Sequence, residues 1–176
     1  MRTGAFKLIQ DSNNPENYLQ NELYELVKND SSIFDFVQET SLDGIWFWDL
    51  ENPDNEWMSP KFWNTLGYDY DEIPHRASFW QSIIDQEDLK ESQELLKRHI
   101  NDPSQPYDHT VRYKHKLGHT VYIRCRGFAI RDDNDKATRM LGAHIDVTKL
   151  RKTKELLKKQ NERYKQLIEG TNLGTW

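Results

Sequence analysis

The sequence predicts an α+β domain built on a five-stranded antiparallel sheet with helices on one face. Two short aromatic strands lie between residues 44 and 59, helical sequence fills residues 61–100, and three further strands follow up to residue 147. Strands joined by tight turns pair antiparallel, and the helices are grouped between the two sets of strands. We therefore expect one sheet with its helices together on a single side.

Length and composition limit the function. A chain of 176 residues holds one domain with helical extensions, and its net charge of −5 argues against nucleic acid as a partner, since phosphate binding needs clustered Lys and Arg. The single cysteine, Cys125, excludes an internal disulfide, as is usual in a reducing compartment. No run is apolar enough for a secretion signal or a membrane span. We expect a cytoplasmic chain without direct membrane contact.

Residues 1–31 are expected to form an N-terminal amphipathic helical extension. Leu19, Leu23, Leu26 and Val27 recur there at helical spacing and would share one face of a helix. Such an apolar face needs a partner, either the domain itself or a second chain.

An aromatic hairpin opens the domain. In its first strand Trp46 and Trp48 share one face, whereas Ile45 and Phe47 share the other. Both faces are apolar and both need cover, and the leading helix is a candidate for one of them.

The middle of the chain predicts a long helix followed by a hairpin. Asp85 and Asp88 stand where the N-terminus of a helix favours carboxylates. Residues 107–116 then alternate between apolar and polar, and Leu117-Gly118 makes a tight turn into residues 120–131. This alternation predicts strands with one buried face.

The sequence changes character at residue 149 and predicts a signalling helix with coiled-coil features over residues 149–168. Leu150, Leu157 and Tyr164 recur every seven residues, and Leu167 lies on the neighbouring seam. The repeat is short and imperfect, which favours a marginal parallel homodimer over a rigid rod.

The end of the chain repeats its beginning. Thr40–Trp46, with Asp43 omitted, is similar to Thr171–Trp176, and the two stretches begin 131 residues apart, about the size of a small domain. We expect residues 169–176 to be the start of a second, truncated copy of the module. An isolated first strand cannot complete a core, so this segment is expected to be poorly ordered.

Several stretches match one known family in order and spacing. They are Gly44–Leu50, Met58–Tyr68, Phe79–Trp80 with Ile84–Asp88, Val111–Gly118, Arg126–Phe128, Arg139–Gly142 and Asp146–Thr148. Together they resemble the PAS fold, specifically its Trp-rich PAS/PAC sensory-box subclass, with residues 32–148 as the sensory domain. The match departs from the family's His-Pro-Asp-Asp segment at the His-Pro.

The resemblance implies a sensory module of a bacterial multi-domain signalling protein. Such modules usually stand upstream of a histidine kinase or a GGDEF diguanylate cyclase and dimerise through their flanking helices. A further PAS domain and an output domain would then follow in the same chain. The sequence has no phosphate loop, nucleophile elbow, kinase or cyclase signature, so we expect no catalytic residues in it.

The place to sense a signal is the space between the sheet and its helices. Seven side chains are candidates for lining it: Trp46, Trp48, Met58, Phe62, Trp63, Trp80 and Cys125. The alternative is that these side chains simply fill the core. The chain would then be a constitutive dimerisation or spacer module without a ligand.

Known cofactor chemistries find little support. Flavin-binding LOV domains need a reactive cysteine beside a helix in an Asn-Cys-Arg context, whereas Cys125 lies in the middle of a strand. Haem needs an axial histidine on the long helix, and His99 falls in its last turn. His115 and His119 flank a tight turn, which argues against a metal site. The sequence does not identify the ligand.

Two polar residues mark the exit from the domain. Asp146 and Thr148 lie where the last strand hands over to the signalling helix, and both can cap free backbone donors. They are either an ordinary cap or a two-state joint that relays a signal.

A catalytic or substrate-binding domain of the same fold is a further alternative. It would require titratable groups that converge in the cavity, and Arg112, Arg124, Arg126 and His144 are the available set. Strand alternation places Arg124 and Arg126 on the face opposite Cys125.

Overall fold

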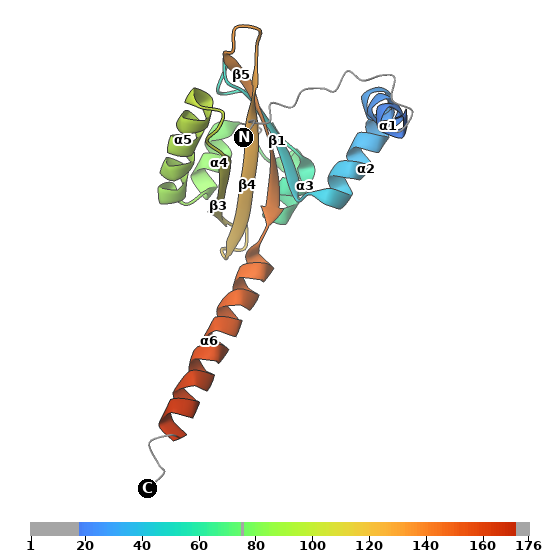
Figure 1. The fold of residues 1–176 in the computed structure, drawn as a ribbon. Coiled ribbons are helices and arrows are strands. Elements are labelled where there is room, and N and C mark those ends of the chain that lie inside the picture. Colours follow the sequence, from blue (N-terminus) through green and yellow to red (C-terminus); the bar gives the residue numbers. More distant parts are fainter. Residues whose placement is uncertain (1–17, 75, 172–176) are drawn as a thin grey trace.

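The computed structural model describes residues 18–74 and 76–171, and its architecture confirms the predicted α+β fold (Figure 1). Its elements are α1 (Tyr18–Asn29), α2 (Ser31–Ser41), β1 (Gly44–Asp49), β2 (Glu56–Met58), α3 (Pro60–Thr65), the 3-10 helix η2 (Tyr70–Glu72), α4 (Ala77–Ile83), α5 (Gln86–Asn101), β3 (Tyr107–Lys114), β4 (Thr120–Arg131), β5 (Ala137–Asp146) and α6 (Thr148–Thr171). Helices α3, α4 and α5 lie between the two sets of strands in the chain, as the sequence predicts.

The sheet is antiparallel throughout, in the order β2-β1-β5-β4-β3. The central strand β5 pairs with β1 on one side and β4 on the other, so the first and last parts of the domain meet there. In this register Trp46 stands opposite both Met58 and Gly142, and Cys125 stands opposite His144. Directly paired residues share a face, so these side chains point to the same side.

The core lies between that inner face and the helices. Phe62 and Leu66 are fully buried, and Trp63 is almost so. Phe62 packs edge-on against Trp63 and Tyr113, with ring centroids 5.1 and 5.5 Å apart. Edge-to-face contacts of this kind stabilise aromatic cores, so α3 is held firmly against the sheet.

Charged groups fix the start of α5 to β3. Asp85 caps the helix by accepting hydrogen bonds from the backbone N–H groups of Glu87 and Asp88, as predicted. Asp88 accepts three hydrogen bonds from Arg112, one from its backbone and two from its guanidinium, and these bonds hold the pKa of Asp88 below its ordinary value. The two ends of this link are 24 residues apart, so it is a tertiary contact.

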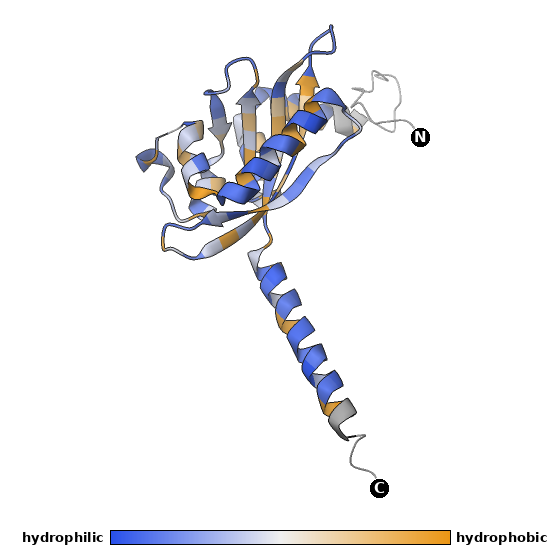
Figure 2. Cartoon of the chain, turned by 90° about the vertical axis from the view of Figure 1, so that its left-hand side faces the viewer, coloured by the Kyte–Doolittle hydropathy of each residue, from blue (hydrophilic) through white to orange (hydrophobic). Residues whose placement is uncertain are grey.

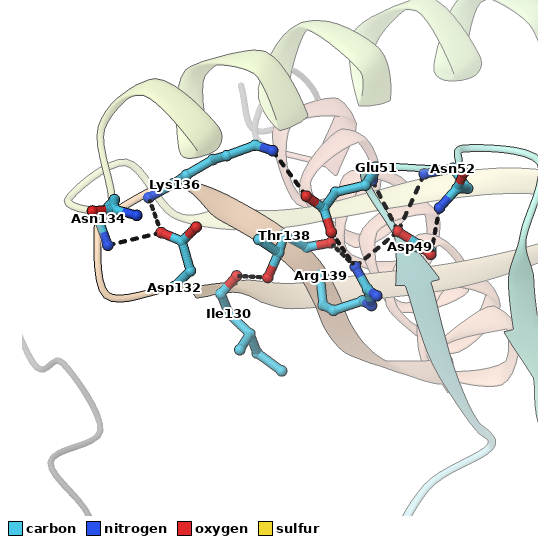
Figure 3. A network of polar contacts seen from close by, with 9 residues as sticks. All are labelled: Asp49, Glu51, Asn52, Ile130, Asp132, Asn134, Lys136, Thr138 and Arg139. Atoms are coloured by element: carbon cyan, nitrogen blue, oxygen red, sulfur yellow. Dashed lines mark hydrogen bonds and ion pairs between the residues drawn. The ribbon is translucent and has the colours of Figure 1, made fainter.

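A polar network ties the β1–β2 turn to the β4–β5 hairpin (Figure 3). Arg139 on β5 donates to Asp49 at 2.8 Å and to Glu51 at 3.2 Å. Lys136 donates to the second oxygen of Glu51 at 2.8 Å. The network holds the end of β1 and the following turn against the long hairpin.

Helix α2 follows α1 directly, lies almost wholly outside the predicted extension of residues 1–31, and reaches β1. The leading helix α1 packs on α2 (Figure 1). It does not cover the outer face of the sheet, so that expectation is wrong for the described residues: Phe47, Phe128 and Ile130 remain 37–41% exposed. A shallow depression of about 490 Å³ on this face is lined by apolar residues that include Leu141. The helices leave the sheet sideways because α2 ends only two residues before β1 begins.

Helix α6 projects away from the domain as a single rod (Figure 1). Figure 2 shows that its surface is mainly hydrophilic with separate hydrophobic patches. Leu150, Leu157, Tyr164 and Leu167, the residues of the predicted seam, are 57–68% exposed. The helix continues to Thr171, while the remainder of the predicted second copy, residues 172–176, lies outside the described residues. None of the described helices is both long and apolar enough to cross a membrane.

Candidate functional site

A cavity of about 40 Å³ lies between the sheet and the helices. One water molecule needs roughly 10–15 Å³ by the same measure, so the space suits a few waters or one small molecule. The residues around it are Trp46, Trp48, Glu56, Met58, Trp80, Ile84, Ser92, Leu96, Tyr107, Val111, Tyr113, Cys125 and His144. They come from β1, β2, β3, β4, β5, α4 and α5 and from Ile84, which follows α4.

Five of the seven predicted pocket residues line this cavity: Trp46, Trp48, Met58, Trp80 and Cys125. The other two lie elsewhere. Phe62 is fully buried and stacks on the His144 ring at 4.3 Å, so it forms the layer behind the cavity wall. Trp63 lines a separate space of about 10 Å³, which Glu56, Met58 and Trp80 also border.

Trp46 has one face on the sheet and the other toward the cavity. Its indole covers Gly142 and Gly127, because a Cβ placed on Gly142 would come within 2.2 Å of the ring and one on Gly127 within 2.8 Å. Only glycine allows this close approach. The Nε1 atom of Trp46 is buried and has no hydrogen-bond partner among the described residues.

Glu56 is the acidic residue of this cavity, and it is one of the lining residues that were not predicted from the sequence. Its carboxylate accepts a hydrogen bond of 2.7 Å from the indole Nε1 of Trp80, and burial raises its pKa to about 7. As a whole residue Glu56 is only partly buried, because its backbone belongs to the edge strand. Strand periodicity offered a signal, since Glu56 stands two residues before Met58 and must share its inward face.

Two further titratable groups on the cavity wall are held neutral. Burial lowers the pKa of His144 to about 3, and its Nδ1 has no partner among the described residues. Burial, reinforced by the charge of Glu56, raises the pKa of the Cys125 thiol well above its ordinary value. Neither group carries charge near neutral pH, so Cys125 is not a ready nucleophile.

The histidine considered for haem is occupied by backbone contacts. Nδ1 of His99 lies 2.6 Å from the carbonyl oxygen of Gln105, and its Nε2 accepts from the N–H of Ala129 at 3.0 Å. The side chain therefore joins the end of α5 to the following loop and to β4. His115 and His119 stack on each other at 4.1 Å, and the described residues contain no cluster of His, Cys, Asp and Glu that could hold a metal ion.

The arginines do not converge on His144. Arg124 and Arg126 pair with Asp108 on the outer side of the sheet, at 2.7 and 3.3 Å, while Arg112 is held by the start of α5. His144 points inward to the cavity instead. The structure therefore does not assemble the four residues considered for a catalytic site.

The joint between β5 and α6 is a chain of hydrogen bonds. The side chain of Asp146 accepts from the N–H of Thr148, and the Thr148 hydroxyl accepts from the N–H of Tyr122 on β4, both at 2.8 Å. Asp43, just after α2, accepts from the N–H of Asp146 at 2.8 Å and donates its own N–H to the carbonyl of His144 at 3.0 Å. The joint thus connects the cavity strand, the N-terminal helices and α6.

Solved structures with a similar fold include PAS and sensory-box domains. A sensory box histidine kinase/response regulator from Burkholderia thailandensis is 24% identical with a TM-score of 0.62, over 76% of this chain and 98% of that one. The N-terminal domain of a diguanylate cyclase with a PAS/PAC sensor from Marinobacter aquaeolei is 19% identical with a TM-score of 0.51, over 60% and 94%. A PAS domain from Colwellia psychrerythraea is 19% identical with a TM-score of 0.54, over 70% and 98%. At these identities the likeness concerns the fold.

The sequence comparisons give the family. No curated protein matches the chain significantly. The model of the family described as PAS fold matches residues 55–144, just over half of the chain and all of the sheet except β1 and the end of β5. With this match and the topology described above, the chain belongs to the PAS fold family.

Proposed function

We propose that the chain is the sensory module of a signal-transduction protein. It binds a small ligand or partner and relays the event through α6 to a downstream histidine kinase or diguanylate cyclase. The observation that carries the proposal is that one strand joins both parts: His144 lines the cavity, and Asp146, two residues further along β5, caps the start of α6. In this proposal residues 1–31 are a helical extension, 32–148 sense, 149–168 signal, and 169–176 begin a second copy.

The relay works as a shift between two positions of the joint. A ligand that moves the His144 ring acts on strand β5. Just beyond His144, hydrogen bonds to Asp43 and Thr148 hold the end of this strand and the start of α6, so they set the direction of α6. The ligand biases the joint only as far as it binds one arrangement more tightly than the other. The module acts in the cytoplasm, has no catalytic activity of its own, and contacts neither nucleic acid nor the membrane.

We also propose that the module works as a homodimer through α6. Its seam residues Leu150, Leu157, Tyr164 and Leu167 are more than half exposed, and a second copy would bury them. Parallel pairing would place two output domains side by side. A change in the helix exit angle would then alter how these domains meet.

The first experiment is native mass spectrometry of the purified chain with an absorbance spectrum. We expect a dimer with excess mass that disappears on denaturation, which would identify a bound small molecule. Relay from the cavity to α6 would be measured as the rate of amide hydrogen exchange in the first turns of α6. Two variants would be compared: Cys125→Leu fills the cavity, whereas Cys125→Ala does not. Unchanged exchange in both variants, with no bound mass, would refute the sensory proposal.

The seam is tested by a matched pair of substitutions. Leu157→Lys should shift the chain toward monomer in light-scattering measurements, because it places charge in the predicted seam. Leu156→Lys introduces the same charge at a leucine of similar exposure, 59% against 64%, outside that seam. Equal effects of the two substitutions would argue against pairing through Leu157.

The cap is tested separately. Asp146→Ala removes the side chain that accepts from Thr148 at an exposed position, so it should alter exchange in α6 while the melting temperature changes little. A large loss of thermal stability would make Asp146 an ordinary structural cap.

The second candidate is a constitutive dimerisation or spacer module with a filled core. The small volume of the cavity, about 40 Å³, favours it, because large aromatic side chains occupy most of the space between sheet and helices. It predicts a dimer without bound mass whose α6 does not respond to filling of the cavity.

A further inference from the structure

We propose that the cavity is built for a small organic cation, such as a protonated alkylamine, with the Glu56 carboxylate as its counter-charge and aromatic rings as its walls. This inference names the ligand class of the sensory site and therefore rests on the proposed function. It depends on the composition of the wall, on the distribution of charge and on the position of Glu56.

The wall is rich in aromatic rings. Five of the lining residues are Trp or Tyr, namely Trp46, Trp48, Trp80, Tyr107 and Tyr113. The indole of Trp46 lies flat on the glycines of the sheet, so its free face is turned to the space, and Tyr107 stands edge-on to it at 5.9 Å. The face of such a ring carries partial negative charge and attracts cations, and indole does so most strongly.

The cavity carries an unbalanced negative charge where Glu56 is ionised, which is above about pH 7. Among the described lining residues Glu56 is the acidic side chain, and the one basic side chain, His144, stays neutral because burial lowers its pKa to about 3. Arg76 borders a neighbouring space of about 10 Å³ together with Glu56, but the two form no ion pair within 4 Å. An ionised carboxylate confined in this way lacks the partner that buried charges normally have.

Glu56 has capacity left for a ligand. One of its carboxylate oxygens, Oε2, accepts from Trp80, and no other hydrogen bond to the carboxylate is formed by the described residues. A carboxylate can accept about four hydrogen bonds, so an ammonium group could donate to Glu56 without displacing Trp80.

Size limits the ligand to a few heavy atoms. A cavity of about 40 Å³ has room for the equivalent of roughly three waters, and ethylammonium has three non-hydrogen atoms. A ligand of this size binds with a dissociation constant of about 1 mM at best, so the assay must detect weak binding.

The test is a titration of the whole chain, labelled with ¹⁵N in its indole groups, with ethylammonium chloride. Ethanol serves as the neutral probe of similar shape and acetate as the anion, all at equal ionic strength. We expect the indole N–H signals of Trp80 and Trp46, assigned with Trp80→Phe and Trp46→Phe, to shift saturably with ethylammonium alone. Glu56→Gln should weaken this binding at least 10-fold, whereas Glu155→Gln, on the exposed surface of α6, should leave it unchanged.

A second readout needs no substitution. Ethylammonium keeps its charge between pH 5.5 and 8, whereas Glu56 ionises over this range. Its affinity for the unaltered chain should therefore rise about 30-fold from pH 5.5 to pH 8.

Three results would overturn the inference: no saturable shift with up to about 100 mM ethylammonium, equal binding of ethanol or acetate, or an affinity that is independent of pH. Equal binding of the neutral probe would leave the sensory proposal standing, because the cavity would still take a ligand. The sensory proposal fails on a different ground, the lack of any response of α6 to filling of the cavity or to a bound ligand, because a ligand of millimolar affinity would be lost on purification and leave no bound mass.

Discussion

Replacing Glu56 with Gln should remove a pH dependence of stability that this carboxyl creates. In the folded chain burial raises its pKa from 4.5 to about 7, against the opposing effect of the Trp80 hydrogen bond. Unfolding returns the group to water, so between these values the unfolded state has lost a proton that the folded state keeps. The contribution of Glu56 to the free energy of unfolding is present below pH 4.5 and is lost as the pH rises through 7.

The expected size follows from the two pKa values. Between pH 5 and pH 8 the difference between 4.5 and about 7 lowers the free energy of unfolding by about 2.5 kcal/mol. His144 works in the opposite direction, because burial lowers its pKa from 6.5 to about 3 and its contribution to the free energy of unfolding therefore rises with pH up to about 6.5. This contribution is the same in the unaltered chain and in Glu56→Gln, so the comparison between the two removes it. The pKa values of Tyr107 and Cys125 are raised above this window.

The assay is urea unfolding followed by circular dichroism at pH 5, 6, 7 and 8. The free energy of unfolding of the unaltered chain should fall relative to that of Glu56→Gln by about 2.5 kcal/mol over this range. The control Glu155→Gln removes a carboxylate from the exposed face of α6 and should keep the original pH profile. Parallel profiles for the unaltered chain and Glu56→Gln would refute the burial of an isolated carboxyl.

Three further predictions concern the packing around the cavity. Gly142→Ala should lower the free energy of unfolding in urea by about 1–3 kcal/mol, because its Cβ would come within 2.2 Å of the Trp46 ring, and an unchanged midpoint would contradict the contact. Asp88→Asn should cost about 1–3 kcal/mol in the same assay, because it weakens the link between α5 and β3, while Glu87→Gln on the exposed surface should cost less than about 0.5 kcal/mol. Cys125 should react with a thiol reagent at neutral pH only on unfolding, since burial raises its pKa, and rapid labelling of the folded chain would show an open cavity.

Local patterns were sufficient to predict the sheet. Alternation in residues 107–116 placed Val111 and Tyr113 inside, and both are buried. Asp85 marked the start of α5 because a cap depends only on the next few residues. The cover of the outer face of the sheet was harder to predict from the sequence. It depends on the direction in which α2 meets β1, and packing outside the strand decides that direction.

The candidate site could be predicted only in part. Large aromatic residues suggested the cavity, and five of the seven lie around it. Phe62 and Trp63 are on the same short helix but in a different layer, since the way α3 rests on His144 determines which side chains reach the space. The polar side of the cavity was missed because Glu56 follows a polar turn, and its two-residue spacing from Met58 is the one sign in the sequence that it faces inward.

By itself the sequence determined which elements form and which side chains share a face, because strand and helix periods act over a few residues. It also determined the long exposed helix at the end, through its seven-residue spacing. Only the tertiary structure decided what meets in the cavity and at the joint. Glu56 accepts a hydrogen bond from Trp80, 24 residues away in the sequence, and Asp43 accepts one from Asp146, 103 residues away. Strand order and helix placement bring these residues together. Such pairings depend on the register of the whole sheet, which no local pattern specifies.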